Sequence, residues 1–250
     1  MNEQKHWDDL SDRYNEEIFD VFQSDRNKRL PLYFARHARP RGVALDFGCG
    51  NGKAFPYLTS LFRSVIGMDI SGELLQEAKK HHYPNVQLKR ADLSRKNILM
   101  PQVDFVFSCN VIMLPELEKN KQMFRNVASA LRNGGAAVMV IPSLESAMFA
   151  AWQMINLHQH EGTTIEEIPA DDLHYFRGSK RSILQGILHI DRVPTKHYQE
   201  PELQILLREA GFQITALERL EYDWSSEFDD PPRWLKDPYP WDWLVECRLK

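Results

Sequence analysis

Short apolar segments alternate with amphipathic segments along the middle of this chain. The apolar segments are rich in β-branched and aromatic residues and lie at 43–47, 64–70, 86–92, 103–110 and 134–142. Most of them are separated by segments with helical features, at 52–62, 71–82 and 116–131. Apolar runs of this length are typical of strands buried in a parallel sheet. Strands that alternate with helices predict an α/β fold with a doubly wound sheet and right-handed crossovers.

The residues before the first apolar run have a helical pattern. Apolar side chains recur there at spacings of three and four, at Trp7, Leu10, Tyr14, Ile18, Val21 and Phe22. This spacing predicts one amphipathic helix, and a second helix is expected over 30–38, before Pro40 and Gly42. We therefore expect residues 1–40 to form an N-terminal helical cap.

After Pro142 the alternation stops, and it resumes only near the end of the chain. A helix is predicted to begin near Pro201 and to end at Gly211, followed by strands near 212–223 and 243–249. Residues 143–196 are thus an expected insertion after the fifth strand. Because open α/β sheets bind ligands at the carboxyl ends of their strands, we expect this insertion to form a substrate lid there.

The insertion contains many polar residues that could carry chemistry. Histidines and carboxylates gather at 158–174, but none of them has a convincing metal-ligand spacing, so a solvated loop is expected and no metal is predicted. Arg177, Lys180 and Arg181 could form a small basic patch, although exposed charges of this kind usually serve solubility.

Composition is ordinary for a globular protein. The chain has 250 residues, 43% of them hydrophobic, and a formal net charge of −4, which gives no overall attraction to a polyphosphate. No apolar stretch approaches the ~20 residues that span a bilayer, and the first residues lack a signal-peptide core, so a cytoplasmic protein is expected. Cys49, Cys109 and Cys247 are too few and too far apart for a disulfide framework or a zinc site.

Three glycines follow the first predicted strand at every second position. Gly48, Gly50 and Gly52 lie between this strand and a predicted helix. Glycines in such a turn let the backbone approach a ligand, and the N-terminus of the helix offers free N–H groups. Asp69 ends the second predicted strand, where a carboxylate can accept hydrogen bonds from both hydroxyls of a ribose. The sequence therefore predicts a cofactor that contains a nucleoside.

Two features favour one kind of nucleoside cofactor over another. The dinucleotide fingerprint is G-x-G-x-x-G, but here Lys53 occupies the place of its third glycine. Asp46 precedes the first glycine by two residues, and its charge would repel a pyrophosphate but attract an ammonium group. A ligand with an amino-acid end and an adenosine end, such as S-adenosylmethionine, fits both acids and the glycines.

At this point the chain resembles the class I S-adenosylmethionine-dependent methyltransferases. ALDFGCGNG is similar to the first motif of that family and VIGMDIS to its acidic second-strand motif. RADL, VDFVFSCNVIMLPE, LRNGGAAVMVIP and PWDWLVECRLK resemble its later motifs in order. The resemblance is to the small-molecule, ubiquinone/menaquinone-methyltransferase-like type. It implies a single domain over 1–250, with a Rossmann-like, seven-stranded sheet whose last strand is antiparallel.

The resemblance also implies which residues hold the methionine end of S-adenosylmethionine. Gly48, Gly50 and Gly52 would line it, and Asp46 would support its ammonium group. Asn110, at the end of the fourth strand, would contact the same portion, although a plain turn is an equal alternative there.

The adenosine end would be held by a second group of residues. Asp69 would bind the ribose hydroxyls and Ile70 would pack on the adenine. Asp92 would accept a hydrogen bond from the adenine amino group, with the Leu93 N–H as a further partner, unless Asp92 only caps a turn. Tyr14 would close over the cofactor, unless it belongs to the core.

Three functions remain open at this point. The first is direct in-line methyl transfer to a small molecule, with S-adenosylhomocysteine as the second product. The second is methylation of transfer RNA, because GCGNGK also resembles enzymes that complete wobble-uridine modifications. The third is a protein that binds S-adenosylmethionine without catalysis, since Met113 and Leu114 stand where many small-molecule members carry histidines. The general base, the acceptor and the oligomeric state are left open.

Overall fold

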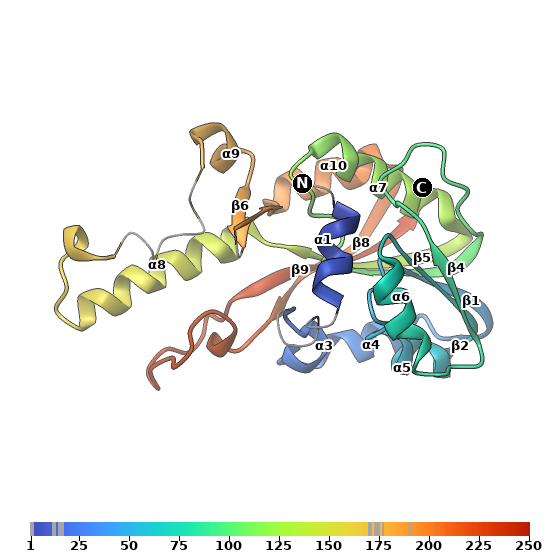
Figure 1. Cartoon of the computed structure of the whole chain (residues 1–250), viewed down its shortest axis with the longest axis horizontal. Helices are drawn as coiled ribbons and strands as arrows, with labels where there is room; N and C mark the ends of the chain where they lie inside the picture. The colour runs from blue at the N-terminus through green and yellow to red at the C-terminus, as the bar shows by residue number, and fades with distance from the viewer. Residues whose placement is uncertain are drawn as a thin grey trace.

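A seven-stranded sheet with helices on both faces forms the centre of the computed structural model (Figure 1). The structure describes residues 3–11, 14, 18–169, 172, 176, 178–190 and 192–250. The strands of this sheet are β1 Arg39–Phe47, β2 Phe62–Asp69, β3 Val86–Arg90, β4 Val103–Cys109, β5 Leu131–Pro142, β8 Phe212–Glu221 and β9 Trp241–Leu249.

The strand order is β3-β2-β1-β4-β5-β9-β8. β1 to β5 pair in parallel, whereas β9 runs antiparallel to both of its neighbours, β5 and β8. The predicted doubly wound fold with an antiparallel last strand is therefore confirmed. Because these strands are parallel, their carboxyl ends lie at the same edge of the sheet. The loops that follow β1, β2 and β4 therefore meet at this edge.

The helices bury apolar side chains against each face of the sheet. In chain order they are α1 Glu3–Leu10, α3 Val21–Ser24, α4 Arg29–Arg36, α5 Phe55–Leu61, α6 Gly72–Lys79, α7 Leu117–Ala130, α8 Leu144–His160, α9 Lys180–Leu184 and α10 Glu200–Glu209. α7 and α10 pack on one face, where Phe124 and Leu207 are fully buried. α4, α5 and α6 pack on the other face, around Phe34 and Phe55.

The prediction of a single amphipathic helix over the apolar residues from Trp7 to Phe22 is wrong. α1 ends at Leu10, and α3 begins only at Val21. The Asp20 carboxylate accepts hydrogen bonds from two backbone N–H groups at the start of α3, which makes it an N-cap that begins a new helix. Several of the apolar residues line cavities instead of forming one stripe.

Polar contacts tie the N-terminal segment to the rest of the fold. The Asp8 carboxylate accepts a hydrogen bond from Ser71 Oγ at 2.6 Å, which joins α1 to the start of α6. The buried Asp25 carboxylate accepts the backbone N–H groups of Arg29 and Leu30 at the start of α4. The Asp8 contact holds α1 near the carboxyl ends of the strands, and the Asp25 contacts fix the turn that leads into α4.

The segment between β5 and α10 extends away from the sheet (Figure 1). It contains α8, α9 and a separate antiparallel hairpin of β6 Ile187–Ile190 and β7 Val193–Lys196. Its ends meet, because Ser143 forms a parallel bridge with Tyr198. The apolar residues 182–190 thus form the end of α9 and then β6.

The polar part of this segment has a local structure. His158 Nε2 lies 2.7 Å from the Asp172 carboxylate. Within the described residues, no group of three or more His, Cys, Asp or Glu side chains could hold a metal ion, and no helix is long and apolar enough to span a bilayer. Asp171, His174 and Arg177, which the sequence also singled out, lie outside the described residues.

A buried amide fixes the loop after β3 to helix α7. Asn126 is 4% exposed, and its Nδ2 donates to the Leu93 carbonyl at 2.8 Å and to the Arg95 carbonyl at 2.9 Å. The loop after β3 does not pair with any strand that the structure describes, so these two hydrogen bonds set the position of Asp92 and Leu93.

We expect Asn126→Ala to lower the free energy of unfolding by about 1–3 kcal/mol, because two carbonyls lose their donor in a buried place. Urea denaturation would measure the change. Arg125→Ala, on the exposed side of the same helix, is the matched control and should cost under about 0.5 kcal/mol. Equal stability of the two variants would contradict this role of Asn126.

Candidate active site

Two adjoining cavities open at the carboxyl ends of the strands. The smaller, of about 180 Å³, lies between the strand ends and α1. The larger, of about 460 Å³, lies between the strand ends, α8, the β6–β7 hairpin and the segment before β9. Both are lined by Trp7, Tyr14, Gly48, Cys109, Asn110, Met113 and Thr195, so these residues form the boundary between the cavities.

Eight of the ten residues that the sequence singled out line the smaller cavity: Tyr14, Gly48, Gly50, Asp69, Ile70, Asp92, Leu93 and Asn110. Asp46 lines the larger cavity. Gly52 lines neither cavity, and a Cβ at this position would lie 2.5 Å from the ring of Phe55. Gly52 therefore lets the loop pack on α5.

The loop after β1 has a backbone that other residues rarely adopt. Gly48 has φ +80° and Gly50 has φ +50°. A Cβ on Gly48 would lie 2.2 Å from a methyl group of Val111, and one on Gly50 would lie 2.7 Å from Tyr14 Oη. The absence of side chains thus brings the loop directly under Tyr14 and the turn after β4.

The Asp69 carboxylate connects the glycine loop to the next turn. Its Oδ2 accepts the Gly50 N–H at 2.8 Å, and its Oδ1 accepts the Ser71 N–H at 2.9 Å. Ser71 in turn caps α6 through a hydrogen bond to the Leu74 N–H. Burial raises the pKa of Asp69, and the two N–H donors oppose this shift. Each carboxylate oxygen keeps a lone pair that could face a ligand.

Asp46 lies beneath the glycine loop with an oxygen that has no partner. The residue is 3% exposed, and its Oδ2 has no hydrogen-bond donor among the described residues. Burial, followed by the nearby charge of Asp69, raises the pKa of Asp46 to about 8. A buried carboxylate without a donor is costly, so this position favours a ligand that supplies a cation or a donor.

The loop after β3 forms another wall of the smaller cavity. The Asp92 carboxylate accepts hydrogen bonds from the N–H and Oγ of Ser94 and from Arg95 Nε, and these donors hold its pKa below the usual value despite partial burial. Asp92 is therefore a turn cap as well as a cavity residue. Leu93 is buried beside it. Ile70, which directly follows β2, also lines the cavity.

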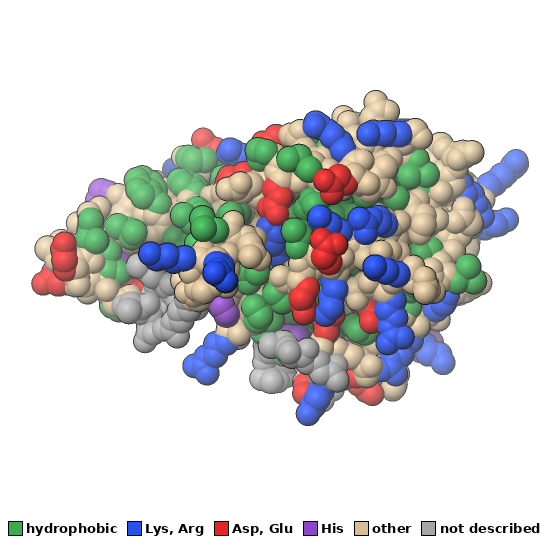
Figure 2. All heavy atoms as spheres, turned by 90° about the horizontal axis from the view of Figure 1, so that it is seen from above, with side chains coloured by type: hydrophobic (Ala, Val, Ile, Leu, Met, Phe, Trp, Pro, Cys, Tyr) green, Lys and Arg blue, Asp and Glu red, His purple; other side chains and the backbone are tan. Residues whose placement is uncertain are grey.

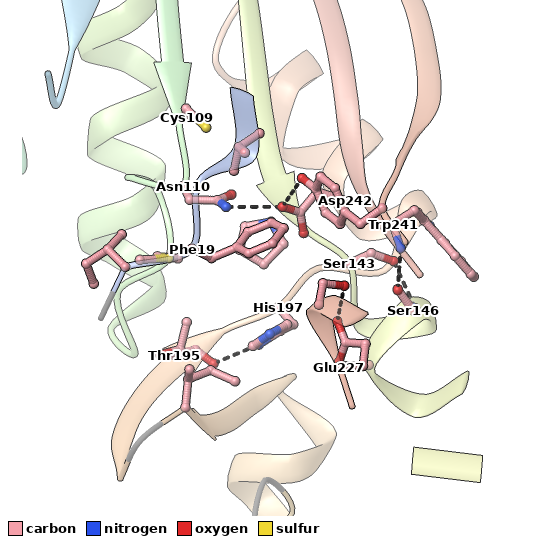
Figure 3. A pocket seen from close by; sticks show the side chains of 18 of the residues that line it. Phe19, Cys109, Asn110, Ser143, Ser146, Thr195, His197, Glu227, Trp241 and Asp242 are labelled. Carbon is pink, nitrogen blue, oxygen red and sulfur yellow. Dashed lines mark hydrogen bonds between the residues drawn. The ribbon is translucent and has the colours of Figure 1, made fainter. Parts of the chain in front are cut away.

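Asn110 stands at the boundary of both cavities. It has φ +52°, a conformation that Asn tolerates better than most residues and that often occurs at functional sites. Its Nδ2 donates to the Asp242 carboxylate at 3.1 Å, and no residue that the structure describes donates to its Oδ1. Figure 3 shows this side chain pointing from the end of β4 toward Asp242.

Comparison with known proteins gives this arrangement a family. Residues 44–135 match the model of a family described as a methyltransferase domain. Together with the strand order and the glycine loop, this match decides the class. Residues 44–135 carry a methyltransferase domain, and the sheet has the strand order expected of the class I S-adenosylmethionine-dependent methyltransferases. The predicted class and its cofactor are thus confirmed at the level of this domain, but the ubiquinone-like subtype is not.

Relatives of known sequence share the same region. The chain is 32% identical over 106 residues to protein 235L of Invertebrate iridescent virus 6, which is named as a methyltransferase. The aligned region covers 42% of this chain and 38% of the viral protein. It is 34% identical over 139 residues to the tRNA (carboxymethyluridine(34)-5-O)-methyltransferase of Saccharomyces cerevisiae, covering 53% of this chain and 47% of the yeast protein. The chain spans less than half of the length of these relatives.

The whole architecture also occurs in solved structures. The structure described as the DhpI-SAM-HEP complex has a TM-score of 0.64 and 17% sequence identity, with 98% of this chain and 94% of that chain covered. A S-adenosylmethionine-dependent methyltransferase from Mesorhizobium loti has a TM-score of 0.63 and 17% identity, covering 92% and 100% of the two chains. At this identity the similarity shows the fold.

The larger cavity of the methyltransferase domain contains polar residues that the sequence did not single out. Asp242 comes from the start of β9, Glu227 from the segment before it, and His197 from the residue after β7 (Figure 3). No local motif marks these positions, because each acquires its neighbours only when the C-terminal segments fold over the strand ends. The unusual density of Trp and acidic residues near the C-terminus was the available signal.

We expect Asp69→Asn to lower the free energy of unfolding of the ligand-free protein by about 1–3 kcal/mol. An amide offers one acceptor, so the Gly50 N–H or the Ser71 N–H would lose its partner. Chemical denaturation without cofactor would measure the loss, with Asp9→Asn on the exposed side of α1 as a control. Unchanged stability of Asp69→Asn would mean that this carboxylate does not hold the two turns together.

Proposed function

We propose that the protein transfers the methyl group of S-adenosylmethionine to a small molecule bound in the larger cavity. The supporting observation is the cavity of about 460 Å³ that adjoins the predicted cofactor site and is closed in by α8 and the β6–β7 hairpin. Its size is within the range of small-molecule sites in proteins, which is about 300–1,000 Å³. An extended polymer would have to insert a single unit into it.

The described residues fit S-adenosylmethionine. Asp46 Oδ2, which has no donor among the described residues, suits the ammonium group of the methionine end, and Gly48 and Gly50 line the adjoining cavity with backbone atoms. Asp69 would accept the ribose hydroxyls, and the pocket between Ile70 and Leu93 would take the adenine. Asp92, Asn110 and Tyr14 complete the proposed set of contacts.

The chemistry places modest demands on the protein. S-adenosylmethionine supplies a methyl group that is already activated by its sulfonium charge. The chain must hold an acceptor in line with this methyl group and keep water away. Trp7 and Tyr14 lie across both cavities, and Met113 lines their boundary, so these apolar side chains would exclude water there.

Residues 143–196 would serve as the lid of the acceptor cavity within a single domain over 1–250. α8 contributes Ala147, Ala150 and Met154 to the cavity wall, and the hairpin contributes Leu188 and Thr195. The N-terminal cap over 1–40 would close the cofactor side, because α1 lies against α6 and lines the smaller cavity.

Methylation of transfer RNA is a second candidate, favoured by the similarity to the yeast tRNA methyltransferase. A single base could enter the larger cavity if it leaves its stack. However, the described candidates for phosphate contacts are few. Lys53 pairs with Asp20 at 3.1 Å, and basic and acidic side chains are interspersed on the face shown in Figure 2.

We expect the affinity for S-adenosylmethionine to rise with pH up to about 8, the pKa of Asp46 in the ligand-free protein. Below this pH the carboxyl group is protonated and must release its proton to pair with the ammonium group of the ligand. Binding is therefore weakened as pH falls, by up to about tenfold per pH unit. Calorimetric titration between about pH 6 and pH 8 would measure the slope, and Asp46→Asn should flatten it. An equal slope in the variant would contradict the assignment.

The acceptor class can be measured with methyl-labelled S-adenosylmethionine and an extract of the source cells, separated into small-molecule, RNA and protein fractions. We expect label in the small-molecule fraction. Label confined to RNA, with activity that falls steeply with salt, would favour the second candidate. Binding of S-adenosylmethionine without label in any fraction would contradict catalysis.

A further inference from the structure

The wall of the larger cavity opposite the cofactor residues is rich in hydrogen-bond acceptors. Asp242 and Glu227 contribute carboxylates, and His197 contributes its ring (Figure 3). The three side chains come from three separate segments, which the fold brings around one space. Their chemistry indicates what kind of molecule the cavity would accept.

Asp242 is held at the boundary with the smaller cavity. Its Oδ2 accepts a hydrogen bond from Tyr222 Oη at 2.8 Å and another from Asn110 Nδ2 at 3.1 Å, and it also accepts the Ser143 backbone N–H. Burial nevertheless raises its pKa to about 6. Because Asn110 lines both cavities, its hydrogen bond to Asp242 places this carboxylate next to the boundary at which transfer would occur.

Glu227 and His197 lie farther along the wall. Glu227 has a weak hydrogen bond from Ser226 Oγ at 3.4 Å, and burial raises its pKa to about 7. His197 is 7% exposed, and burial lowers its pKa to about 4, so its ring is neutral. Its Nδ1 lies 3.1 Å from the Thr195 carbonyl and donates to it. This leaves Nε2 as an acceptor, with no donor among the described residues.

Positive charge is scarce around this space. Among the described residues that line the larger cavity, Lys53 is the one permanent cation, and it pairs with Asp20 at 3.1 Å. The carboxylates of Asp242 and Glu227 have no cationic partner among the described residues. A cavity with acceptors and uncompensated acids favours a ligand that brings both donors and a positive charge.

Aromatic rings form much of the remaining wall. Phe19, Phe228 and Trp241 line the cavity together with the ring of Tyr222, and the Arg219 guanidinium already lies over the Trp241 ring, 4.0 Å from its centroid. Aromatic faces attract cations, and the effect grows when the cation is removed from water. Trp241 is 6% exposed, and its indole Nε1 has no acceptor in the part of the chain that the structure describes, which suits a ligand that also carries an acceptor atom.

We propose that the acceptor is an amine whose ammonium form lies beside Asp242, with Glu227, His197 and the aromatic wall around it, and that this nitrogen is methylated. This inference rests on the proposed methyl transfer and names its substrate class. Two carboxylates, a neutral acceptor nitrogen and aromatic faces in one cavity carry it.

The proposed step balances within the site. The ammonium group gives one proton to the Asp242 carboxylate, and the free amine nitrogen forms a bond to the methyl carbon. The bond between this carbon and sulfur breaks, with its electron pair remaining on sulfur. The products are the methylated ammonium ion and S-adenosylhomocysteine, and Asp242 returns its proton to solvent.

The charge of the labelled product tests this class without knowledge of the substrate. Small molecules labelled in the extract would first be separated from unreacted S-adenosylmethionine, which is itself a cation, and then passed over a cation-exchange resin at about pH 7. A methylated amine stays cationic and is retained, as the proposal expects. Label in the flow-through would overturn the amine while methyl transfer to a small molecule still stands.

Binding can be tested without turnover, in the presence of S-adenosylhomocysteine. We expect 2-phenylethylamine to bind at least about tenfold more tightly than 2-phenylethanol, because a charge-assisted contact contributes about 1.5–3 kcal/mol. Equal binding of the two probes, or binding of neither, would overturn the amine. S-adenosylhomocysteine binding in the same titration reports separately on the cofactor site.

Glu227→Gln keeps the shape of the side chain and removes its charge. It should lower the affinity for the amine probe, or raise the KM for the amine, by about tenfold or more, while the affinity for the cofactor is unchanged. Asp229→Asn, at an exposed position of the same segment outside the cavity, is the matched control and should have no effect. An equal effect of both variants, or of neither, would contradict a role for Glu227 in holding the acceptor.

Discussion

The Asp69 carboxylate is the contact on which the organisation of the site depends. It accepts one N–H from the glycine loop after β1 and another from the turn that begins α6. Two neighbouring strands thus end in turns that share one buried acid. Because the carboxylate is buried, loss of either hydrogen bond would leave a donor unsatisfied, and the geometry of the loop would relax. Glycine adopts the positive φ angles of this loop at little cost, and these hydrogen bonds hold the loop in that one conformation.

A second constraint comes from the antiparallel strand β9. It lies between β5 and β8, and its first residues reach the carboxyl ends of the parallel strands from the opposite direction. Asp242 therefore meets Asn110, although 132 positions separate them in the sequence. The hydrogen bond between Asn110 and Asp242 thus links a predicted cofactor residue to the wall of the larger cavity.

The N-terminal region illustrates how an apolar pattern can mislead. Spacings of three and four residues predicted one helix. Instead, residues 18–20 are not helical, and Asp20 caps a new helix. Trp7, Tyr14 and Ile18 line cavities instead of a core stripe. Apolar residues line ligand cavities as well as packed cores. Local periodicity in the sequence does not distinguish these two locations.

The sequence by itself determined the alternation of strands and helices, the glycine loop and Asp69, because these depend on local periodicity, backbone freedom and position at a strand end. It also indicated the antiparallel last strand through its resemblance to a family. Only the tertiary structure decided which residues face the larger cavity. Asp242, Glu227 and His197 carry no local signal, and they meet because segments distant in sequence fold over one edge of the sheet. Such contacts depend on long-range packing, whereas a turn or a helix cap depends on neighbours along the chain.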